Sequence, residues 1–163
     1  MTTKKRNIIL DVDTGSDDAV AIMTALLSDE LNVVGITTVH GNLPVVYTTD
    51  NTLRVVDFMK SEVPVYAGCA YPLVRDLLPG RAVNTGEMHE KVIVDGKVVA
   101  VHEQELPLPK PTSKVRDEPA VIWMINTIKN SHEKITLIPV GAMTNVATAL
   151  RIDPSIRENI DEI

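Results

Sequence analysis

The 163-residue sequence contains few aromatic residues and a single cysteine. The aromatic residues are one Trp, one Phe and three Tyr, which are too few to build a stacking platform for nucleic-acid bases. The single cysteine, Cys69, excludes an internal disulfide bond and a zinc site made of several cysteines. The core must therefore be built from Val, Ile, Leu, Ala and Met.

The sequence also lacks an excess of positive charge and long apolar runs. Acidic residues outnumber basic residues by 22 to 16, which gives a formal net charge of −6. A nucleic-acid-binding protein would normally carry a basic patch instead. No run approaches the length of about 18 apolar residues that a membrane span needs, and the start of the sequence does not resemble a signal peptide. We therefore expect a cytoplasmic protein that binds neither nucleic acid nor membranes.

Short β-branched runs alternate with segments of helical periodicity along most of the chain. We predict strands at residues 8–10, 31–39, 63–66 and 135–140, and helices that begin at residue 17 or cover 48–60, 119–130 and 144–151. Strands separated by helices are typical of parallel βαβ units, and continuous apolar strands fit a sheet covered on both faces. The sequence therefore predicts an α/β fold, with an open and mostly parallel sheet flanked by helices, in a single domain over residues 1–163.

The first predicted helix carries its own orientation signals. Val20, Met23 and Leu27 recur at helical spacing and mark an apolar side. Asp17 and Asp18 lie in the first turn, where the helix dipole favours acidic side chains.

Residues 72–118 interrupt the alternation of strands and helices. This stretch holds five prolines, and within it two β-branched arms flank Asp95 and Gly96. An Asp-Gly pair between such arms is a strong signal for a two-residue hairpin turn, because both central residues need positive φ. We predict an inserted β-hairpin near residues 91–101 that projects from the edge of the sheet. It is interpreted as a solvated insertion, with a lid or a subunit contact as alternatives.

Four aspartates, Asp11, Asp13, Asp17 and Asp18, lie within eight residues directly after the first strand. We call residues 11–18 the acid loop. The four carboxylates repel one another unless a cation or protons intervene, and the carboxyl edge of a parallel sheet is where ligands bind. Helix capping explains Asp17 or Asp18, but it does not explain the two acids that alternate at the end of a buried strand. The acid loop is therefore the candidate functional site.

Several known signatures overlap the acid loop. The letters DTGS at residues 13–16 also occur in aspartic proteases, but those enzymes need an all-β fold. An EF-hand loop would place a bidentate Glu where Ile22 stands. A Mg²⁺-dependent phosphatase of the haloacid-dehalogenase type also places D-x-D at its first strand end, but it expects Thr where Gly15 stands. This phosphatase remains an alternative.

Three stretches of the sequence together carry a more specific signal. The letters ILDVDTGSDDAVAI resemble the D-x-D-x-G-x-D-D-A signature of the inosine-uridine nucleoside hydrolases. The letters TTVHGN at 37–42 resemble the T-x-x-x-G-N of that family, and IPVGAMTNVA at 138–147 resembles its P-x-G-x-L-T-N-[IL]-A. The resemblance covers nearly the whole chain except about residues 80–115. It implies a Rossmann-like α/β core.

The resemblance implies an enzyme, a nucleoside N-ribohydrolase that cleaves the N-glycosidic bond of ribonucleosides and releases ribose and the free base with the help of Ca²⁺. By resemblance, Asp13 binds Ca²⁺ and acts as general base towards a Ca²⁺-bound water. Asp18 is then a second carboxylate ligand, and Val140 supplies a backbone carbonyl. Oxygen ligands of this kind suit Ca²⁺, and acids beside the sugar can stabilise the positive charge that builds up during cleavage.

The resemblance also assigns residues around the metal site. Asp17 and Asn42 would bind the ribose hydroxyls, whereas Asp11 and Asn145 would orient the site without touching the substrate. His89 is a candidate for contact with the base, although the family's usual H-G-x-x-G-like loop is absent at that place. Base preference, purine or pyrimidine, is therefore left open.

Family members take one more metal-ligating Asp and a His that protonates the leaving base from a carboxyl-terminal half. The chain stops at residues 159–163, where the resemblance places the start of another sheet strand. We therefore expect the amino-terminal half of a larger domain, with weak Ca²⁺ binding and little hydrolysis by this polypeptide alone. A catalytically inactive nucleoside- or ribose-binding fragment is the second alternative. By resemblance, we also expect a homo-oligomer, either a dimer or a tetramer.

Overall fold

A computed structural model of the chain describes residues 4–77, 91–100 and 103–163. Four parallel strands form one sheet in the order β3-β2-β1-β6. Their bounds are Arg6–Val12 for β1, Leu31–Thr38 for β2, Val65–Ala67 for β3 and Thr136–Pro139 for β6. The predicted α/β fold with an open parallel sheet is confirmed.

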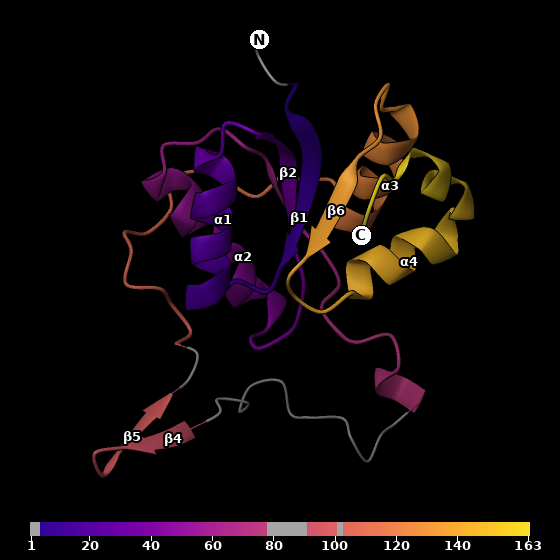
Figure 1. Cartoon of the computed structure of the whole chain (residues 1–163). Helices are drawn as coiled ribbons and strands as arrows, with labels where there is room; N and C mark the ends of the chain where they lie inside the picture. Colours follow the sequence, from indigo (N-terminus) through magenta and orange to yellow (C-terminus); the bar gives the residue numbers. More distant parts are fainter. Residues whose placement is uncertain (1–3, 78–90, 101–102) are drawn as a thin grey trace.

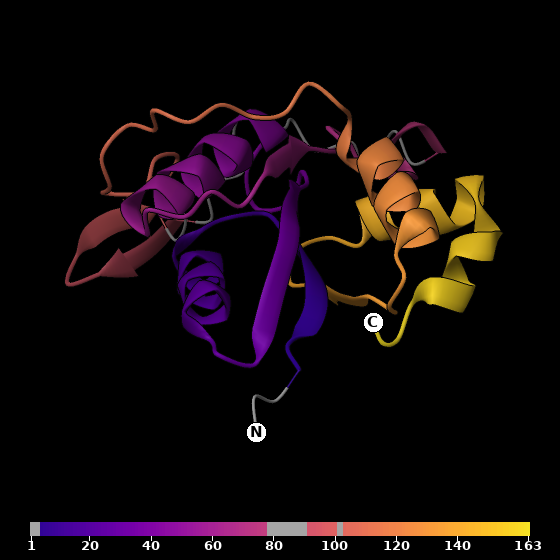
Figure 2. The ribbon, with the colours of Figure 1, turned by 90° about the horizontal axis from the view of Figure 1, so that it is seen from above.

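Helices cover both faces of this sheet (Figures 1 and 2). One face packs against α1 (Ser16–Leu27) and α2 (Val45–Phe58), and the other packs against α3 (Ala120–Asn130) and α4 (Thr144–Ile152). Two 3₁₀ helices, η1 at Arg75–Leu77 and η3 at Pro154–Asn159, complete the described helices. The result is a three-layer arrangement around a central sheet.

The apolar side chains of the central strand β1 are buried on both faces of the sheet. Ile8 and Leu10 point into the core shared with α1 and α2, whereas Ile9 points into the core shared with α3 and α4. All three side chains are buried, because each face of a doubly covered sheet needs apolar side chains.

The apolar side predicted for α1 is wrong in part. Val20 is 63% exposed and Leu27 is 72% exposed, although Met23 packs partly against the core. The buried side instead carries Asp18 and Ile22, together with two alanines. Asp18 and Ile22 are four residues apart and share one side of the helix, so the side of α1 that packs against the core also carries Asp18 to the strand ends.

The predicted hairpin is confirmed. Strands β4 (Lys91–Val94) and β5 (Lys97–Ala100) pair antiparallel and form a separate two-stranded sheet. The two turn residues Asp95 and Gly96 have φ of 51° and 74°, as the two-residue turn requires. Figure 1 shows this hairpin lying apart from the central sheet.

The segment that follows the hairpin runs along α2, as Figure 2 shows. We call residues 103–113 the strap. The buried guanidinium of Arg54 donates to the carbonyl oxygen of Leu108 and to Oε2 of Glu105. Asp57 accepts hydrogen bonds from Thr112 and Ser113. Side chains of α2 therefore hold the strap at both of its ends.

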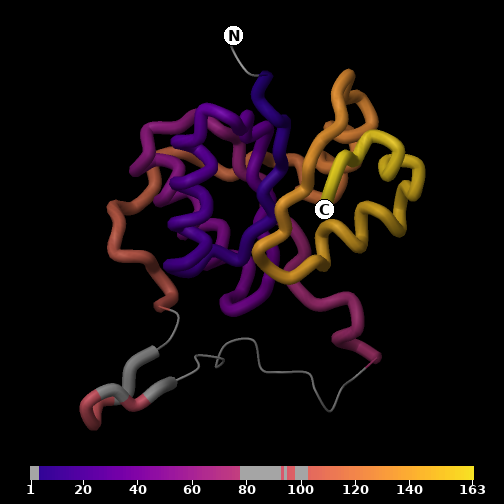
Figure 3. Tube along the Cα trace, in the orientation of Figure 1, coloured from indigo at the N-terminus to yellow at the C-terminus, as the bar shows by residue number. Residues whose placement is uncertain are grey.

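The last described residues run beside β6 (Figure 3). Ile135 and Ile160 form a parallel bridge, and the N–H of Leu137 donates to the carbonyl oxygen of Glu162 at 2.9 Å. Residues 159–162 thus extend the sheet beyond β6, where the resemblance places another strand. Among the described residues, no helix is long and apolar enough to cross a membrane.

Candidate active site

The acid loop lies where the strand order of the sheet reverses. From β1 the chain continues to β2 and β3 on one side, and it later adds β6 on the other side. Asp11 sits at this point, in register with Thr37 on β2 and with Pro139 on β6. A crevice outside the carboxyl ends of parallel strands is the usual ligand site of such sheets.

Asp11 is buried at the end of β1, and only one of its two carboxylate oxygens is hydrogen-bonded by the described residues. Its Oδ1 accepts from Oγ1 of Thr37 and from Nδ2 of Asn145, each at 2.7 Å. Its Oδ2 is buried and has no hydrogen-bond partner among the described residues. Burial raises the pKa of Asp11 to about 6, although these hydrogen bonds oppose the increase. The Asp11 backbone carbonyl accepts from the N–H groups of Val140 and Gly141, which ties β1 to the loop after β6.

Asn145 joins the ends of three strands. Besides Asp11, its Nδ2 donates to the carbonyl oxygen of Thr38 at 2.9 Å, and its Oδ1 accepts from the N–H of Cys69 at 2.8 Å. A Cβ at Gly68 would collide with the Asn145 amide, so this close contact requires glycine. Although Asn145 lies in the first turn of α4, its side chain points into the sheet edge and does not cap the helix.

Asp13 is buried between two glycines. Its Oδ2 accepts a hydrogen bond of 2.7 Å from the backbone N–H of Asn42. A Cβ at Gly41 would collide with the Asp13 carboxylate, and a Cβ at Gly141 would come within 2.7 Å of its Oδ1. Gly41 and Gly141, which belong to the second and third sequence motifs, therefore leave room for the Asp13 carboxylate of the first.

Asp18 is the second buried acid of the loop. Its Oδ2 accepts from the N–H of Gly15 at 3.3 Å, and its Oδ1 is buried without a partner among the described residues. Burial raises the pKa of Asp18 to about 6, and the neighbouring charges of Asp13 and Asp17 act in the same direction. The N-terminus of α1 offsets part of this cost, because the helix dipole favours a negative charge there.

The remaining predicted site residues lie around these acids. Asp17 and the side chain of Asn42 are exposed, and Val140 is half exposed directly after β6. His89 lies outside the described residues. The roles assigned to all four residues stay predictions.

The donor set fits a hard cation such as Ca²⁺. Two unpartnered, buried carboxylate oxygens, Asp11 Oδ2 and Asp18 Oδ1, leave negative charge that the described residues do not compensate. Ca²⁺ takes about six to eight oxygen ligands, whereas the described part of the chain contains no group of three or more His, Cys, Asp or Glu placed to hold a metal. The acids of the loop would therefore supply only part of such a shell.

Sequence reasoning missed the polar face of α2, which consists of Thr48, Thr49, Asn51 and Thr52. All four side chains are buried. Thr48 donates to the carbonyl oxygen of Val39 at 3.0 Å, so this face contacts the loop after β2. The available signal was a run of Thr and Asn within a helix, since both residue types are poor helix formers that need a local reason to be there.

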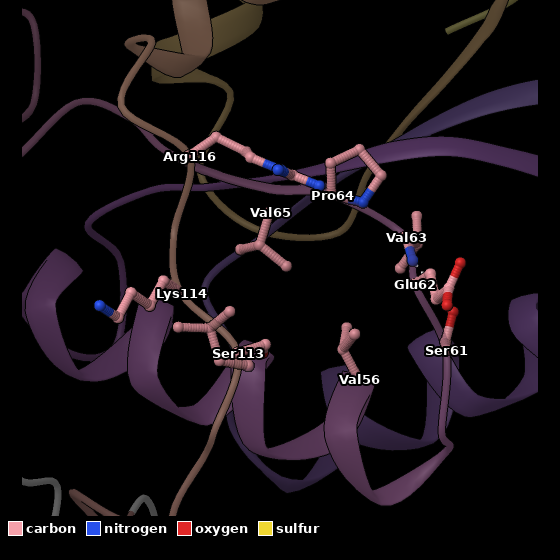
Figure 4. A pocket seen from close by; sticks show the side chains of 10 residues that line it. Val56, Ser61, Glu62, Val63, Pro64, Val65, Ser113, Lys114 and Arg116 are labelled. Carbon is pink, nitrogen blue, oxygen red and sulfur yellow. Dashed lines mark hydrogen bonds between the residues drawn. The ribbon is translucent and has the colours of Figure 1, made fainter.

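A cavity of about 450 Å³ lies elsewhere, between the end of α2, the start of β3 and the segment after the strap (Figure 4). Val56 and Val65 form apolar parts of its lining, and Ser61, Lys114 and Arg116 add polar groups. Because it opens at the amino end of β3, it is separate from the acid loop at the carboxyl ends.

Comparison with known proteins places the chain in a family. Residues 8–163 match the model of the family described as inosine-uridine preferring nucleoside hydrolase. A pyrimidine-specific ribonucleoside hydrolase of Escherichia coli is 38% identical over 160 residues, which cover 98% of this chain and 47% of the relative.

Solved structures agree with this match. An inosine-guanosine nucleoside hydrolase superposes with a TM-score of 0.76 at 25% identity, covering 96% of this chain and 44% of its own. A purine-preferring ribonucleoside hydrolase from Gardnerella vaginalis superposes with a TM-score of 0.73 at 30% identity, covering 95% of this chain and 46% of its own. The chain thus spans about half the length of the relatives that it matches. By family match, relatives and fold together, the chain belongs to the inosine-uridine preferring nucleoside hydrolases.

Proposed function

We propose that this chain supplies the amino-terminal part of a Ca²⁺-dependent active site that hydrolyses the N-glycosidic bond of ribonucleosides. The observation that carries the proposal is the arrangement of Asp13 and Asp18. Both are buried at the switch point of the sheet, and one oxygen of Asp13 is fixed by the Asn42 N–H. Family membership and the names of the relatives support the same reaction.

Asp13 is the proton acceptor in this proposal. The Asn42 N–H fixes Oδ2 and so orients the carboxylate, which would accept a proton from the attacking water. Asp13, Asp18 and the backbone carbonyl of Val140 would hold Ca²⁺. When bound, this ion makes water more acidic and gives the ribose diol a binding partner.

Asp17 and Asn42 act on the sugar. Cleavage of an N-glycosidic bond builds positive charge on the ribose ring, and fixed carboxylates beside the ring stabilise that charge. Asp17 and the side chain of Asn42, both exposed at the edge of the site, bind the ribose hydroxyls. Asp11 and Asn145 orient the strand ends that carry these groups, through the hydrogen bond between them.

Base preference needs direct measurement, because the relatives are named as pyrimidine-specific, inosine-guanosine and purine-preferring hydrolases. We keep His89 as the candidate for contact with the base. We also propose a cytoplasmic location, as the sequence features predict, and a dimeric or tetrameric assembly, which follows from the resemblance.

The test compares the 163-residue chain with a chimera in which it is joined to the part of the E. coli relative beyond the match. We expect the chimera to release reducing sugar from uridine or inosine in the presence of Ca²⁺ and to lose this activity with a chelator. Asp13→Ala should abolish turnover, and the chain alone should show little activity. Both proteins must first give cooperative thermal unfolding.

Two outcomes would favour the alternatives. Mg²⁺-dependent hydrolysis of p-nitrophenyl phosphate, with no sugar released, would support the phosphatase. Calorimetric binding of ribose or nucleoside by a folded chimera without turnover would support an inactive binding protein.

A further inference from the structure

Two residues on the polar face of α2, Asn51 and Thr52, bind the acid loop at Thr14. Thr14 lies between the two site residues Asp13 and Gly15, and its side chain is fully buried. Its hydroxyl lies 2.7 Å from the hydroxyl of Thr52, and its carbonyl oxygen accepts from Nδ2 of Asn51 at 3.1 Å. The hydroxyl and the carbonyl of Thr14 are therefore both fixed by one helix.

The direction of the hydroxyl bond follows from counting protons. The Thr52 hydroxyl has one proton, which it donates to the carbonyl oxygen of Thr48 at 2.7 Å. Thr52 can therefore only accept from Thr14, and Thr14 is the donor in the bond between them. Replacing Thr52 by Val would leave a buried donor without a partner.

Asn51 also binds the strap. Its Oδ1 accepts from the N–H of Leu106 at 2.9 Å, and its Nδ2 donates to the carbonyl oxygen of Gln104 at 3.2 Å as well as to Thr14. One buried amide thus connects α2, the strap and the acid loop. Buried polar groups that are fully paired in this way fix a single local geometry.

We propose that Asn51 and Thr52 are positioning residues for Asp13. They fix Thr14, and through it they hold Asp13 at the Asn42 N–H and Asp18 at the Gly15 N–H. The four acids of the loop repel one another, so the loop needs such anchors to keep this arrangement. The importance of the arrangement rests on the proposed function, whereas the positioning itself can be tested without it.

The chain offers a matched control. Arg54 lies on the same helix, is also buried and also holds the strap, through Leu108 and Glu105. None of the hydrogen bonds that we find for Arg54 reaches the acid loop. Arg54→Met therefore loosens the strap and lowers stability as Asn51→Ala does, but it leaves the bonds of Thr14 in place.

The experiment measures backbone amide signals of the ¹⁵N-labelled 163-residue chain by NMR. The Asn42 and Gly15 amides report directly on Asp13 and Asp18, because each donates to one of these carboxylates. We expect both amide protons to move upfield in Asn51→Ala and in Thr52→Val. Thr52→Ser, which keeps the hydroxyl, should return them to their wild-type positions, and Arg54→Met should not move them.

A Ca²⁺ titration adds a second measurement. We expect the Ca²⁺ dissociation constant of Asn51→Ala to rise by about 10-fold, the lower end of what loss of a group supporting a metal ligand usually costs. If Ca²⁺ leaves the wild-type spectrum unchanged, the proposed metal site fails, while the amide signals still decide the positioning role.

Wild-type amide positions in Asn51→Ala and Thr52→Val would overturn the proposal, and so would equal movement in Arg54→Met. If Asn51→Ala does not fold, the Thr52→Val and Thr52→Ser pair decides alone.

Discussion

The backbone N–H of Asn42 donates a hydrogen bond to Oδ2 of Asp13, and the two residues are 29 positions apart in the sequence. They belong to the loops that follow β2 and β1. Because the donor is a backbone group, the orientation of the Asp13 carboxylate is set by the path of the chain at Gly41. It does not depend on the side chain of Asn42, which is free to serve a ligand.

Gly41→Ala should displace Asp13. The new Cβ would collide with the Asp13 carboxylate, and relief of the collision would break the Asn42 bond. We expect Ca²⁺ affinity, measured by calorimetry, to fall by about 10- to 100-fold. The free energy of unfolding should fall by about 1–3 kcal/mol, as for other overpacked sites.

The control for this change is Gly96→Asn in the hairpin. A Cβ at Gly96 meets nothing within 4 Å, and Asn tolerates the positive φ of this position. Gly96→Asn should therefore keep wild-type Ca²⁺ affinity. Wild-type affinity in Gly41→Ala would show that the glycine is not needed for the site.

Asn145→Ala should destabilise the fold strongly. The substitution leaves the Asp11 carboxylate, the Thr38 carbonyl and the Cys69 N–H without their shared partner. Loss of hydrogen bonds that leaves several buried groups unsatisfied costs about 3 kcal/mol. Urea denaturation gives the free energy of unfolding for this comparison.

The matched variant is Asn126→Ala on α3. Asn126 is exposed and donates to Oε1 of Glu118, so its loss should cost no more than about 0.5 kcal/mol. Equal costs for the two variants would contradict the bridging role of Asn145.

The sequence predicts the sheet and the hairpin because their signals are local. Strand β1 is continuously apolar, and Asp95-Gly96 specifies its turn directly. The rotation of α1 was not predictable in the same way, because apolar side chains such as Val20 and Leu27 surround much of the helix. Its rotation depends on the packing of Ala19, Ile22 and Ala25 against the sheet, which is a tertiary contact.

The same distinction applies to the site. Asp13 and Asp18 could be identified because they follow a strand within a few residues. By contrast, one partner of the Asp11 carboxylate is Asn145, 134 positions away, and no pattern within the sequence joins them. The polar face of α2 was missed because Thr and Asn in a helix are normally interpreted as a solvated side, whereas here they bind the loops of the site.

Asp18→Asn should stabilise the metal-free chain. The Asp18 carboxylate is buried, and one of its oxygens has no partner among the described residues, so an ionised group at this place costs stability. Removing the charge should raise the free energy of unfolding by about 1 kcal/mol, or the Tm by about 2–4 °C for a chain of this size. Differential scanning calorimetry without Ca²⁺ measures this change.

Addition of Ca²⁺ should reverse the order of the two Tm values, so that the wild-type chain becomes the more stable one. The wild-type chain gains stability in proportion to its Ca²⁺ binding, whereas Asp18→Asn lacks one ligand and should gain less. A Tm for Asp18→Asn below that of the wild type without Ca²⁺ would contradict the view that the Asp18 carboxylate destabilises the metal-free chain.

Asp57 should make the stability of the chain depend on pH in the acid range. Burial of its carboxyl raises the pKa, but hydrogen bonds from Ser113 and Thr112 outweigh burial and lower the pKa to about 2. The pKa of Asp57 in the folded chain is therefore below 3.8, the usual value for an aspartate. The stabilisation is then fully present above about pH 4 and is lost as the pH falls towards 2.

Asp57→Asn removes this dependence. Because Asp57 is only partly buried, solvent screening reduces the expected cost at pH 7 to about 1 kcal/mol. Urea denaturation at pH 7 and near pH 2 should show a difference between wild type and variant at the higher pH, and almost none at the lower. Asp117→Asn, at an exposed residue before α3, controls for the change of charge. If the difference in the free energy of unfolding persists unchanged near pH 2, the negative charge of Asp57 is not what stabilises the strap.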